Sequence, residues 1–197
     1  MPRTKSFNVD EALDVAVDVF WRRGFAATSM EDLVAEMGIN RGSLYATFGS
    51  KESLYELALA RYADGALSRL AEILNDEAHS MAERIETLLR AAASGDQRGC
   101  LVVNTAMERG AEHEASRQAA ADVTRRMRMS VAEAIRVASN HDGRGNTLSD
   151  GFTPESAANV VLATMQGLKV SATIEPDSQD MLYAVVDDTV RMLFAVR

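Results

Sequence analysis

Apolar residues recur at three- and four-residue intervals along most of this chain, which is the pattern of helices that bury one face. The pattern is interrupted where Ser, Thr, Asn, Gly or Pro would cap or end a helix. These interruptions predict helices at about residues 9–23, 30–37, 41–48, 51–75, 81–93, 100–109 and 114–139, then one that opens at Thr153-Pro154 and ends before Pro176, and one at about 178–195. We therefore expect an all-α protein of about nine helices.

The predicted helices have apolar stripes that we expect to be buried. The first has Leu13, Ala16, Val17 and Phe20, the second Met30, Leu33, Val34 and Met37, the third Leu44 and Phe48, and the fourth Leu54, Leu57, Ala58, Tyr62, Ala66, Leu70 and Leu74. The seventh has Ala121, Val131 and Ile135, the eighth Ala158, Val161, Leu162, Met165 and Leu168, and the ninth Leu182, Val185, Val186, Thr189 and Leu193. Together these stripes would form the core.

Two short helices near the N-terminus have the clearest local signals. Thr28 and Ser29 supply N-cap oxygens, and Glu31 or Asp32 stands where a capping box needs its reciprocal acceptor. Gly38 follows the last apolar residue of this helix, at a position that favours a positive φ, and the next helix begins almost at once. This arrangement is the helix-turn-helix pattern, in which the second helix enters the DNA major groove.

The residues around these helices resemble the N-terminal DNA-binding domain of the TetR family of bacterial transcriptional regulators. The resemblance extends back to about Asn8, covers roughly a third of the chain, and rests on Gly24-Phe25, Met37-Gly38-Ile39, Leu44-Tyr45 with Phe48, and Ser50-Lys51-Glu52. It implies a helix-turn-helix DNA-binding domain over residues 1–50. It further implies a helical effector-binding and dimerisation domain over residues 51–197.

The outward residues of the third helix are the candidates for contacting bases. Arg41 can form bidentate hydrogen bonds with guanine, or it could contact only a phosphate. The hydroxyls of Ser43 and Thr47 can donate to or accept from several bases. Gly42 would let the backbone lie close to the groove, or it only weakens a solvated helix. The resemblance implies that Tyr45 contacts a phosphate, whereas the alternative packs it between helices. The family often has histidine where Thr47 stands, so no phosphate contact is carried over there.

Phosphate contacts are expected at helix N-termini, where free backbone N–H groups favour anions. Lys51 adds its own charge at the fourth helix, and Thr28 and Ser29 offer hydroxyls at the second. Arg3 and Lys5 in the N-terminal tail would bind the DNA backbone or minor groove, or remain solvated. The candidate DNA-binding residues are Thr28, Ser29, Arg41, Gly42, Ser43, Tyr45, Thr47 and Lys51.

The net charge of −8 over 197 residues would oppose DNA binding if it were evenly spread. Residues 1–51 hold six basic and seven acidic side chains, whereas the remainder holds fifteen and twenty-two. Most of the excess negative charge therefore lies outside the predicted DNA-binding domain, and salt screening over about 8 Å limits its reach.

The last two helices are candidates for a dimer interface. Two adjacent amphipathic helices can pair with the same two helices of a second copy around a twofold axis. The resemblance implies this homodimer, because TetR-like proteins dimerise in this way. The alternative is that the two helices only close the core of one subunit.

The effector side of the chain is less specific. Gly99-Cys100-Leu101 resembles a stretch that opens the sixth helix near the ligand cavity in one branch of the family. A cysteine at a helix N-terminus beside Arg98 could have a lowered pKa and react with electrophiles, or it could simply be a small packed residue. Candidate effector-binding residues, each of which could equally be ordinary core, are Tyr62, Cys100, Asn104, Met107, Met127, Met165 and Gln166.

Other classes of protein find little support. No apolar run is long enough for a membrane span, the N-terminus lacks a signal-peptide pattern, and one cysteine cannot form an internal disulfide, so we expect a cytoplasmic protein. We find no nucleophile elbow, phosphate loop or acid–base pair, and His79, His113 and His141 are scattered. No enzymatic activity, metal or cofactor is expected.

The sequence thus predicts a DNA-binding transcriptional regulator. We expect a repressor that binds a palindromic operator as a homodimer until a small-molecule effector favours a conformation with displaced recognition helices. The alternatives are a redox- or electrophile-responsive regulator acting through Cys100, a transcriptional activator, an enzyme on a helical scaffold, and a ligand-independent architectural DNA binder.

Overall fold

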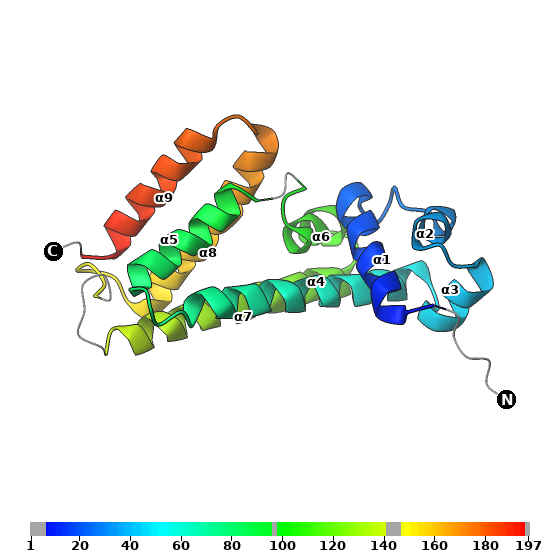
Figure 1. Ribbon diagram of the computed structural model, residues 1–197, viewed down its shortest axis with the longest axis horizontal. Helices are drawn as coiled ribbons and strands as arrows, with labels where there is room; N and C mark the ends of the chain where they lie inside the picture. Colours follow the sequence, from blue (N-terminus) through cyan, green and yellow to red (C-terminus); the bar gives the residue numbers. More distant parts are fainter. Residues whose placement is uncertain (1–6, 96–97, 141–146, 196–197) are drawn as a thin grey trace. The chain divides into compact units, whose positions relative to one another are not determined.

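The computed structural model describes residues 7–95, 98–140 and 147–195. These residues form helices and connecting turns, with no strand among them (Figure 1). The helices are α1 Val9–Arg23, α2 Met30–Met37, α3 Arg41–Phe48, α4 Lys51–Leu74, α5 Met81–Ala93, α6 Leu101–Arg109, α7 Glu114–Ala138, α8 Pro154–Ile174 and α9 Gln179–Leu193. The predicted all-α fold is confirmed. Within the described ranges, no helix combines the length and apolar character that crossing a bilayer requires.

Local capping explains why the helix boundaries lie so near their predicted positions. Asn8 accepts hydrogen bonds from the backbone N–H groups that follow it, at the start of α1. Capping boxes open α2, α5 and α8, the last with Pro154 at the first helical position. The prediction for α2 needs one correction: Ser29 alone is its N-cap, with Asp32 as the reciprocal acceptor.

The chain folds into two compact units. The N-terminal unit consists of Met1–Gly65 with Leu101–Ala120, and the C-terminal unit consists of Ala66–Cys100 with Ala121–Arg197. The N-terminal unit therefore extends beyond residues 1–50: the first part of α4 shares a core with α1 to α3, and α6 contacts α4 and the turn between α1 and α2. Each unit has its own hydrophobic core.

The core of the N-terminal unit joins α1, α2, α3 and the first turns of α4. Its buried residues are Ala12, Ala16, Val19, Phe20, Leu33, Ile39, Leu44, Phe48, Leu54, Tyr55 and Ala58. Leu13 and Val17 are only partly buried, because the side of α1 that faces the core carries Ala12 and Val19. The prediction that Leu57 is buried is wrong: its exposed fraction is 45%, since the buried stripe of α4 runs through Tyr55, Ala58 and Leu59.

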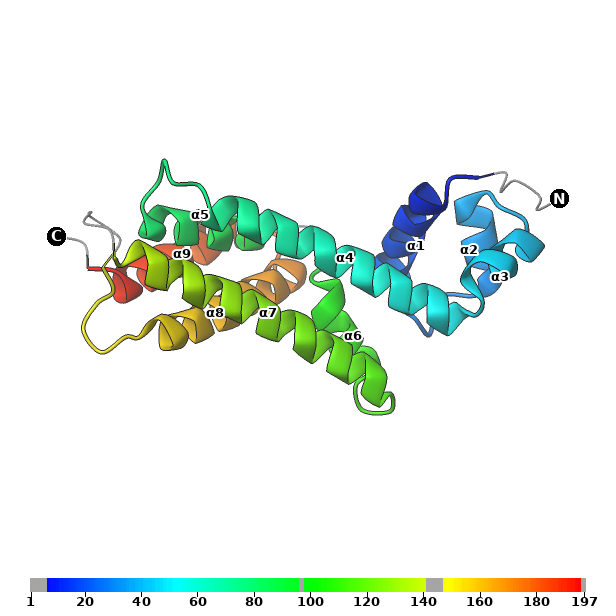
Figure 2. The same cartoon turned by 90° about the horizontal axis from the view of Figure 1, so that it is seen from below.

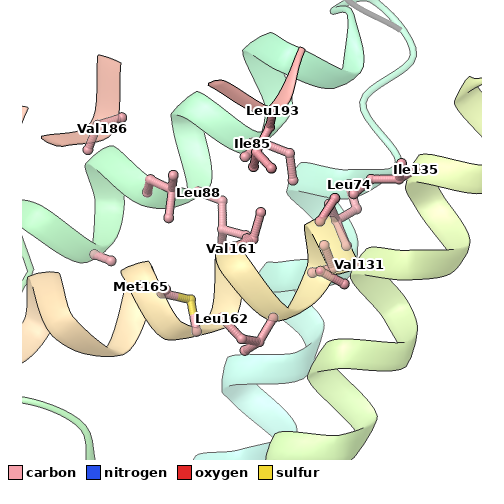
Figure 3. Packing of buried hydrophobic residues seen from close by; sticks show 14 of the residues in the cluster. Leu74, Ile85, Leu88, Val131, Ile135, Val161, Leu162, Met165, Val186 and Leu193 are labelled. Atoms are coloured by element: carbon pink, nitrogen blue, oxygen red, sulfur yellow. The ribbon is translucent and has the colours of Figure 1, made fainter. Parts of the chain in front are cut away.

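The core of the C-terminal unit is formed by the end of α4 with α5, α7, α8 and α9 (Figures 2 and 3). In Figure 3, side chains of Ile85 and Leu88 from α5 face Val161 from α8, and Leu193 of α9 lies beside Ile85. Two predicted core positions on these helices are wrong. Ala121 is exposed, because its neighbours Ala120 and Val123 take the inward positions. Val185 has an exposed fraction of 39%, since Leu182, Val186 and Thr189 fill the inner face of α9.

Candidate nucleic-acid interface

The two helices of the helix-turn-helix are held together by a small apolar contact. Leu33 of α2 and Leu44 and Phe48 of α3 are buried in the same core. Gly38 joins the helices in the left-handed conformation, with φ of 65°, which glycine adopts without the steric cost that a Cβ brings. Asn40 then caps α3 by accepting a hydrogen bond from the backbone N–H of Ser43 at 2.8 Å. The turn and both caps thus set the direction of α3.

The outward face of α3 carries the predicted base-contacting residues. Arg41, Gly42 and Tyr45 are exposed, whereas Ser43 and Thr47 are half-buried. The Arg41 side chain is 64% exposed and donates a hydrogen bond to Glu31 of α2 at 2.8 Å. Its guanidinium also lies over the Tyr45 ring, 5.7 Å from the centroid. Arg41 would therefore exchange an exposed ion pair for a contact with DNA, and exposed pairs of this kind are weak.

Lys51, a predicted phosphate contact, has an ammonium group that is bonded within the protein rather than free in solvent. Its Nζ donates to the backbone carbonyl of Phe25 at 3.0 Å and to that of Thr28 at 2.9 Å. The ammonium also lies 4.1 Å from the centroid of the Phe25 ring. Lys51 therefore has a structural role at the turn before α2, in addition to the predicted contact with DNA.

Thr28 and Ser29, the other two predicted phosphate contacts, differ in accessibility. Thr28 is buried, and its hydroxyl donates to the carbonyl of Gly24 at 2.6 Å, so its side chain is not presented to a ligand. Ser29 is exposed, and its hydroxyl donates to Asp32 at 2.6 Å while accepting from the Asp32 backbone N–H at 3.1 Å. The Ser29 backbone N–H also donates to the Asp32 carboxylate at 2.9 Å. The bonds from the Ser29 hydroxyl and the Ser29 N–H to this carboxylate, with a further contribution from Arg23, lower the pKa of Asp32 to about 2.

The structure also places residues at this site that the sequence did not indicate. The carboxylate of Glu108, on α6, accepts hydrogen bonds from the backbone N–H groups of Phe25 and Ala26 at 3.0 and 2.8 Å. Arg22 and Arg23 of α1 form ion pairs with Glu36 of α2. No local pattern could have revealed the Glu108 contact, since its partners are more than eighty residues away in the chain. Arg3 and Lys5 lie outside the described residues.

The predicted effector-binding residues are divided between the two units. Tyr62, Asn104 and Met107 belong to the N-terminal unit, and Cys100, Met127, Met165 and Gln166 belong to the C-terminal unit. Tyr62 and Met165 are buried, whereas Asn104 and Met107 are exposed and the other three are half-buried. Their role in binding an effector stays a prediction.

The C-terminal unit has a cavity of about 1040 Å³ that none of the predicted residues lines. It lies between the end of α4, the connection to α5, the second half of α7 and the start of α8. Ala71, Leu74, Ala132 and Val137 contribute apolar walls, and Arg84, Glu133, Arg136 and Glu155 are its charged residues on helices. Arg136 forms ion pairs with both Glu133 and Glu155.

The outer surface of α8 and α9 is apolar over several turns. Val170 and Ile174 of α8 and Met181, Val185 and Met192 of α9 are large hydrophobic side chains with exposed fractions of 39% to 71%. On α9 these residues recur at helical spacing and form one side of the helix. A contiguous exposed apolar patch often marks a site of contact with another molecule, whereas single scattered apolar residues are common on any protein surface.

A helix-turn-helix with an accessible second helix, followed by a helical unit with an uncovered apolar side, defines a class of DNA-binding regulators. Comparison with known families agrees. Residues 12–58 match the model of bacterial regulatory proteins of the tetR family, and residues 66–186 match the tetracyclin repressor-like C-terminal domain. The chain belongs to the TetR family.

Curated relatives include repressors from Escherichia coli. The chain is 36% identical to the HTH-type transcriptional repressor ComR over 107 residues, which is 52% of this chain and 51% of that protein. It is 34% identical to the HTH-type transcriptional repressor BdcR over 106 residues, or 51% and 53% of the two chains. The matched part thus spans about half the length of these relatives.

Solved structures match over nearly the whole chain. A cysteine mutant of the TetR family transcriptional regulator CifR, complexed with a 26-bp double-strand operator DNA, has a TM-score of 0.77 and 32% identity. That match covers 97% of this chain and 99% of CifR. The reduced form of NemR from Escherichia coli has a TM-score of 0.82 over 95% and 97% of the two chains, and at 22% identity it shows a shared fold only.

Proposed function

We propose that this protein is a transcriptional repressor that binds a palindromic operator as a homodimer and is released by a small-molecule effector. The observation that carries the proposal is the accessible outward face of α3, on a helix-turn-helix that matches the family model. The similarity to CifR, which was solved with operator DNA, supports the same conclusion.

The proposed roles of the interface residues follow from their chemistry and accessibility. Arg41 contacts a guanine edge or a phosphate, and Ser43 and Thr47 contact base edges from the same face of α3. Gly42 allows close approach of the backbone. Tyr45, Lys51 and Ser29 contact phosphates, which position the protein without selecting sequence. No contact through the Thr28 hydroxyl is proposed, because that hydroxyl is buried and bonded to Gly24.

The proposed homodimer uses the apolar side of α8 and α9. Pairing Val170, Ile174, Met181, Val185 and Met192 with the same residues of a second copy would remove them from water around a twofold axis. Two α3 helices could then meet successive turns of one DNA face, which lie about 34–36 Å apart.

The proposed regulation needs an effector that prefers the conformation unable to bind DNA. Typical coupling of this kind amounts to about 1–3 kcal/mol. The electrophile-responsive alternative would use Cys100, which is half-buried directly before α6. That alternative predicts that Cys100→Ser abolishes the response to an electrophile; release that persists in the variant would exclude it.

Footprinting of the DNA upstream of the protein's own gene tests the proposed function. Two protected half-sites related by a dyad are expected, with affinity that falls as salt rises. In vitro transcription from the same DNA distinguishes a repressor from an activator. A purified, folded protein that protects no site at low salt would contradict the proposal.

A further inference from the structure

The turn between α1 and α2, residues Gly24–Thr28, is held by side chains from two distant helices. Glu108 of α6 accepts hydrogen bonds from the N–H groups of Phe25 and Ala26 at 3.0 and 2.8 Å. Lys51 of α4 donates to the carbonyls of Phe25 and Thr28. The Glu108 carboxylate thus binds two backbone N–H groups of the turn, and the Lys51 ammonium binds two of its backbone carbonyls. All of these residues belong to the N-terminal unit.

The shape of the turn fits this carboxylate closely. Gly24 has φ of 77°, and a Cβ built there would lie 3.0 Å from Oε2 of Glu108. Such a distance is tighter than ordinary contacts, so glycine lets the carboxylate approach the backbone. Hydrogen bonds in which one partner is ionised are also roughly twice as strong as neutral ones. The contact is thus closely fitted and charge-assisted.

Two neighbours of Glu108 on α6 contact the same region. Arg109 is 9% exposed, and its guanidinium lies 3.6 Å from the centroid of the Phe25 ring and 5.0 Å from that of Tyr55. Thr105 shares a buried hydrogen bond of 2.8 Å with the Tyr55 hydroxyl. Because these contacts hold α6 against α4 and the turn, the Glu108 carboxylate is presented to the turn from a fixed position.

The position of this turn determines where α2 begins. Ser29, the N-cap of α2, directly follows Thr28, and α2 packs against α3 through the shared core. A shift of the turn would therefore move the helix pair that meets DNA. Simple electrostatics predicts the opposite role for Glu108, since a carboxylate in a DNA-binding unit should only repel phosphate.

We propose that Glu108 is a positioning residue for operator binding, which holds the Gly24–Thr28 turn, and with it α2 and α3, in the geometry that recognises DNA. This inference rests on the proposed function. It concerns a residue outside the helix-turn-helix that contacts no DNA itself. Its carboxylate acts through the backbone N–H groups of Phe25 and Ala26.

Glu108→Gln tests the proposal, with Glu112→Gln as the matched control. Both substitutions remove one negative charge from the N-terminal unit, and Glu112 is exposed beyond the end of α6. In Glu108→Gln, one amide oxygen can accept only part of the original pair of bonds, and the amide NH₂ opposes the other N–H. We expect operator affinity to fall about tenfold relative to Glu112→Gln, with unchanged affinity for non-specific DNA.

Amide hydrogen exchange provides the second readout, on the full-length protein. Exchange at Phe25 and Ala26 should accelerate in Glu108→Gln and not in Glu112→Gln, while both variants keep the helical circular dichroism of the wild type. Operator affinity in Glu108→Gln that equals or exceeds that of Glu112→Gln, or unchanged exchange at both amides, would overturn the proposal. Failure of the wild type and the control to bind any operator would instead overturn the proposed function.

Discussion

Single polar side chains at helix ends account for much of the local order around the DNA-binding helices. Ser29 and Asp32 satisfy each other's backbone N–H groups at the start of α2, which otherwise would lack partners. Arg23 adds an ion pair to the same carboxylate at 2.7 Å. Because the Asp32 carboxylate is titratable, the stability that these bonds provide depends on pH.

Asp32→Asn should reduce the free energy of unfolding most at neutral pH. Its folded pKa of about 2 lies below the ordinary value of 3.8, so the carboxylate stabilises the fold fully above about pH 4. This contribution is lost as the pH falls through about 2. Denaturation measured across this range should show a difference between wild type and variant that shrinks with falling pH. Asp177→Asn, at an exposed turn, is the control; a difference that grows at low pH would contradict the prediction.

Arg41→Ala separates base recognition from phosphate contact. If Arg41 contacts a guanine, the substitution should weaken the free energy of operator binding by about 1–3 kcal/mol, while the free energy of binding to unrelated DNA changes less. If Arg41 contacts only a phosphate, both affinities should fall by the same factor. Glu31→Gln, which removes the present partner of Arg41, should leave the preference for the operator intact. Competition binding with operator and scrambled DNA measures both quantities.

Lys51→Ala should flatten the dependence of log affinity on log salt by about one unit, because one phosphate contact is lost. The structure adds a second effect: loss of the bonds to Phe25 and Thr28 should lower the thermal stability of the N-terminal unit. Lys169→Ala removes the same charge from α8 and should change neither property. An unchanged salt slope in Lys51→Ala would argue against its contact with DNA.

At the scale of helices, the apolar pattern predicts the position of each helix more accurately than it predicts which of its residues are buried. On α4 the stripe turns toward Tyr55 and Leu59 and leaves Leu57 outside, and on α9 it leaves Val185 outside. A helix has several apolar positions on neighbouring faces, and only the packing partner selects among them. The exposed side of α9 is therefore a property of the folded molecule.

Val185→Asp should weaken the proposed homodimer and with it operator binding. A carboxylate buried in an apolar interface loses its hydration without gaining a partner, which should raise the dimer dissociation constant by at least about tenfold. Met129→Asp is the control, because Met129 is an exposed apolar residue of α7, outside the α8–α9 surface. Sedimentation velocity over a concentration series measures the change. Equal dimerisation of both variants would contradict this interface.

At the scale of the whole molecule, the distribution of charge reconciles a net charge of −8 with DNA binding. Residues 1–51, which include the helix-turn-helix, have a net charge of −1, with six basic and seven acidic side chains, whereas the whole N-terminal unit, with nine basic and thirteen acidic side chains, has a net charge of −4. Within the N-terminal unit, Asp18, Asp32 and Glu36 are paired with Arg22 and Arg23, so part of the negative charge is locally compensated. Arg41 and Lys51, at the N-termini of α3 and α4, therefore face less uncompensated negative charge from α1 and α2.

The sequence alone determined the helices, their caps and the helix-turn-helix. Each of these depends on residues within about four positions of one another, since capping bonds and helical hydrogen bonds are local. The third helix, Arg41–Phe48, has its predicted bounds and its predicted inward residues Leu44 and Phe48. Accessible Arg41 and Tyr45 could likewise be anticipated from helical periodicity.

Tertiary structure alone decided how the turn before α2 is held. The bonds of Glu108 to Phe25 and Ala26 join residues more than eighty positions apart, and no local pattern predicts such a pairing. The same holds for the burial of Thr28 and for the cavity near the end of α4, which none of the predicted effector residues lines. Such features arise where separate helices meet, and only the packing of those helices determines which side chains come together.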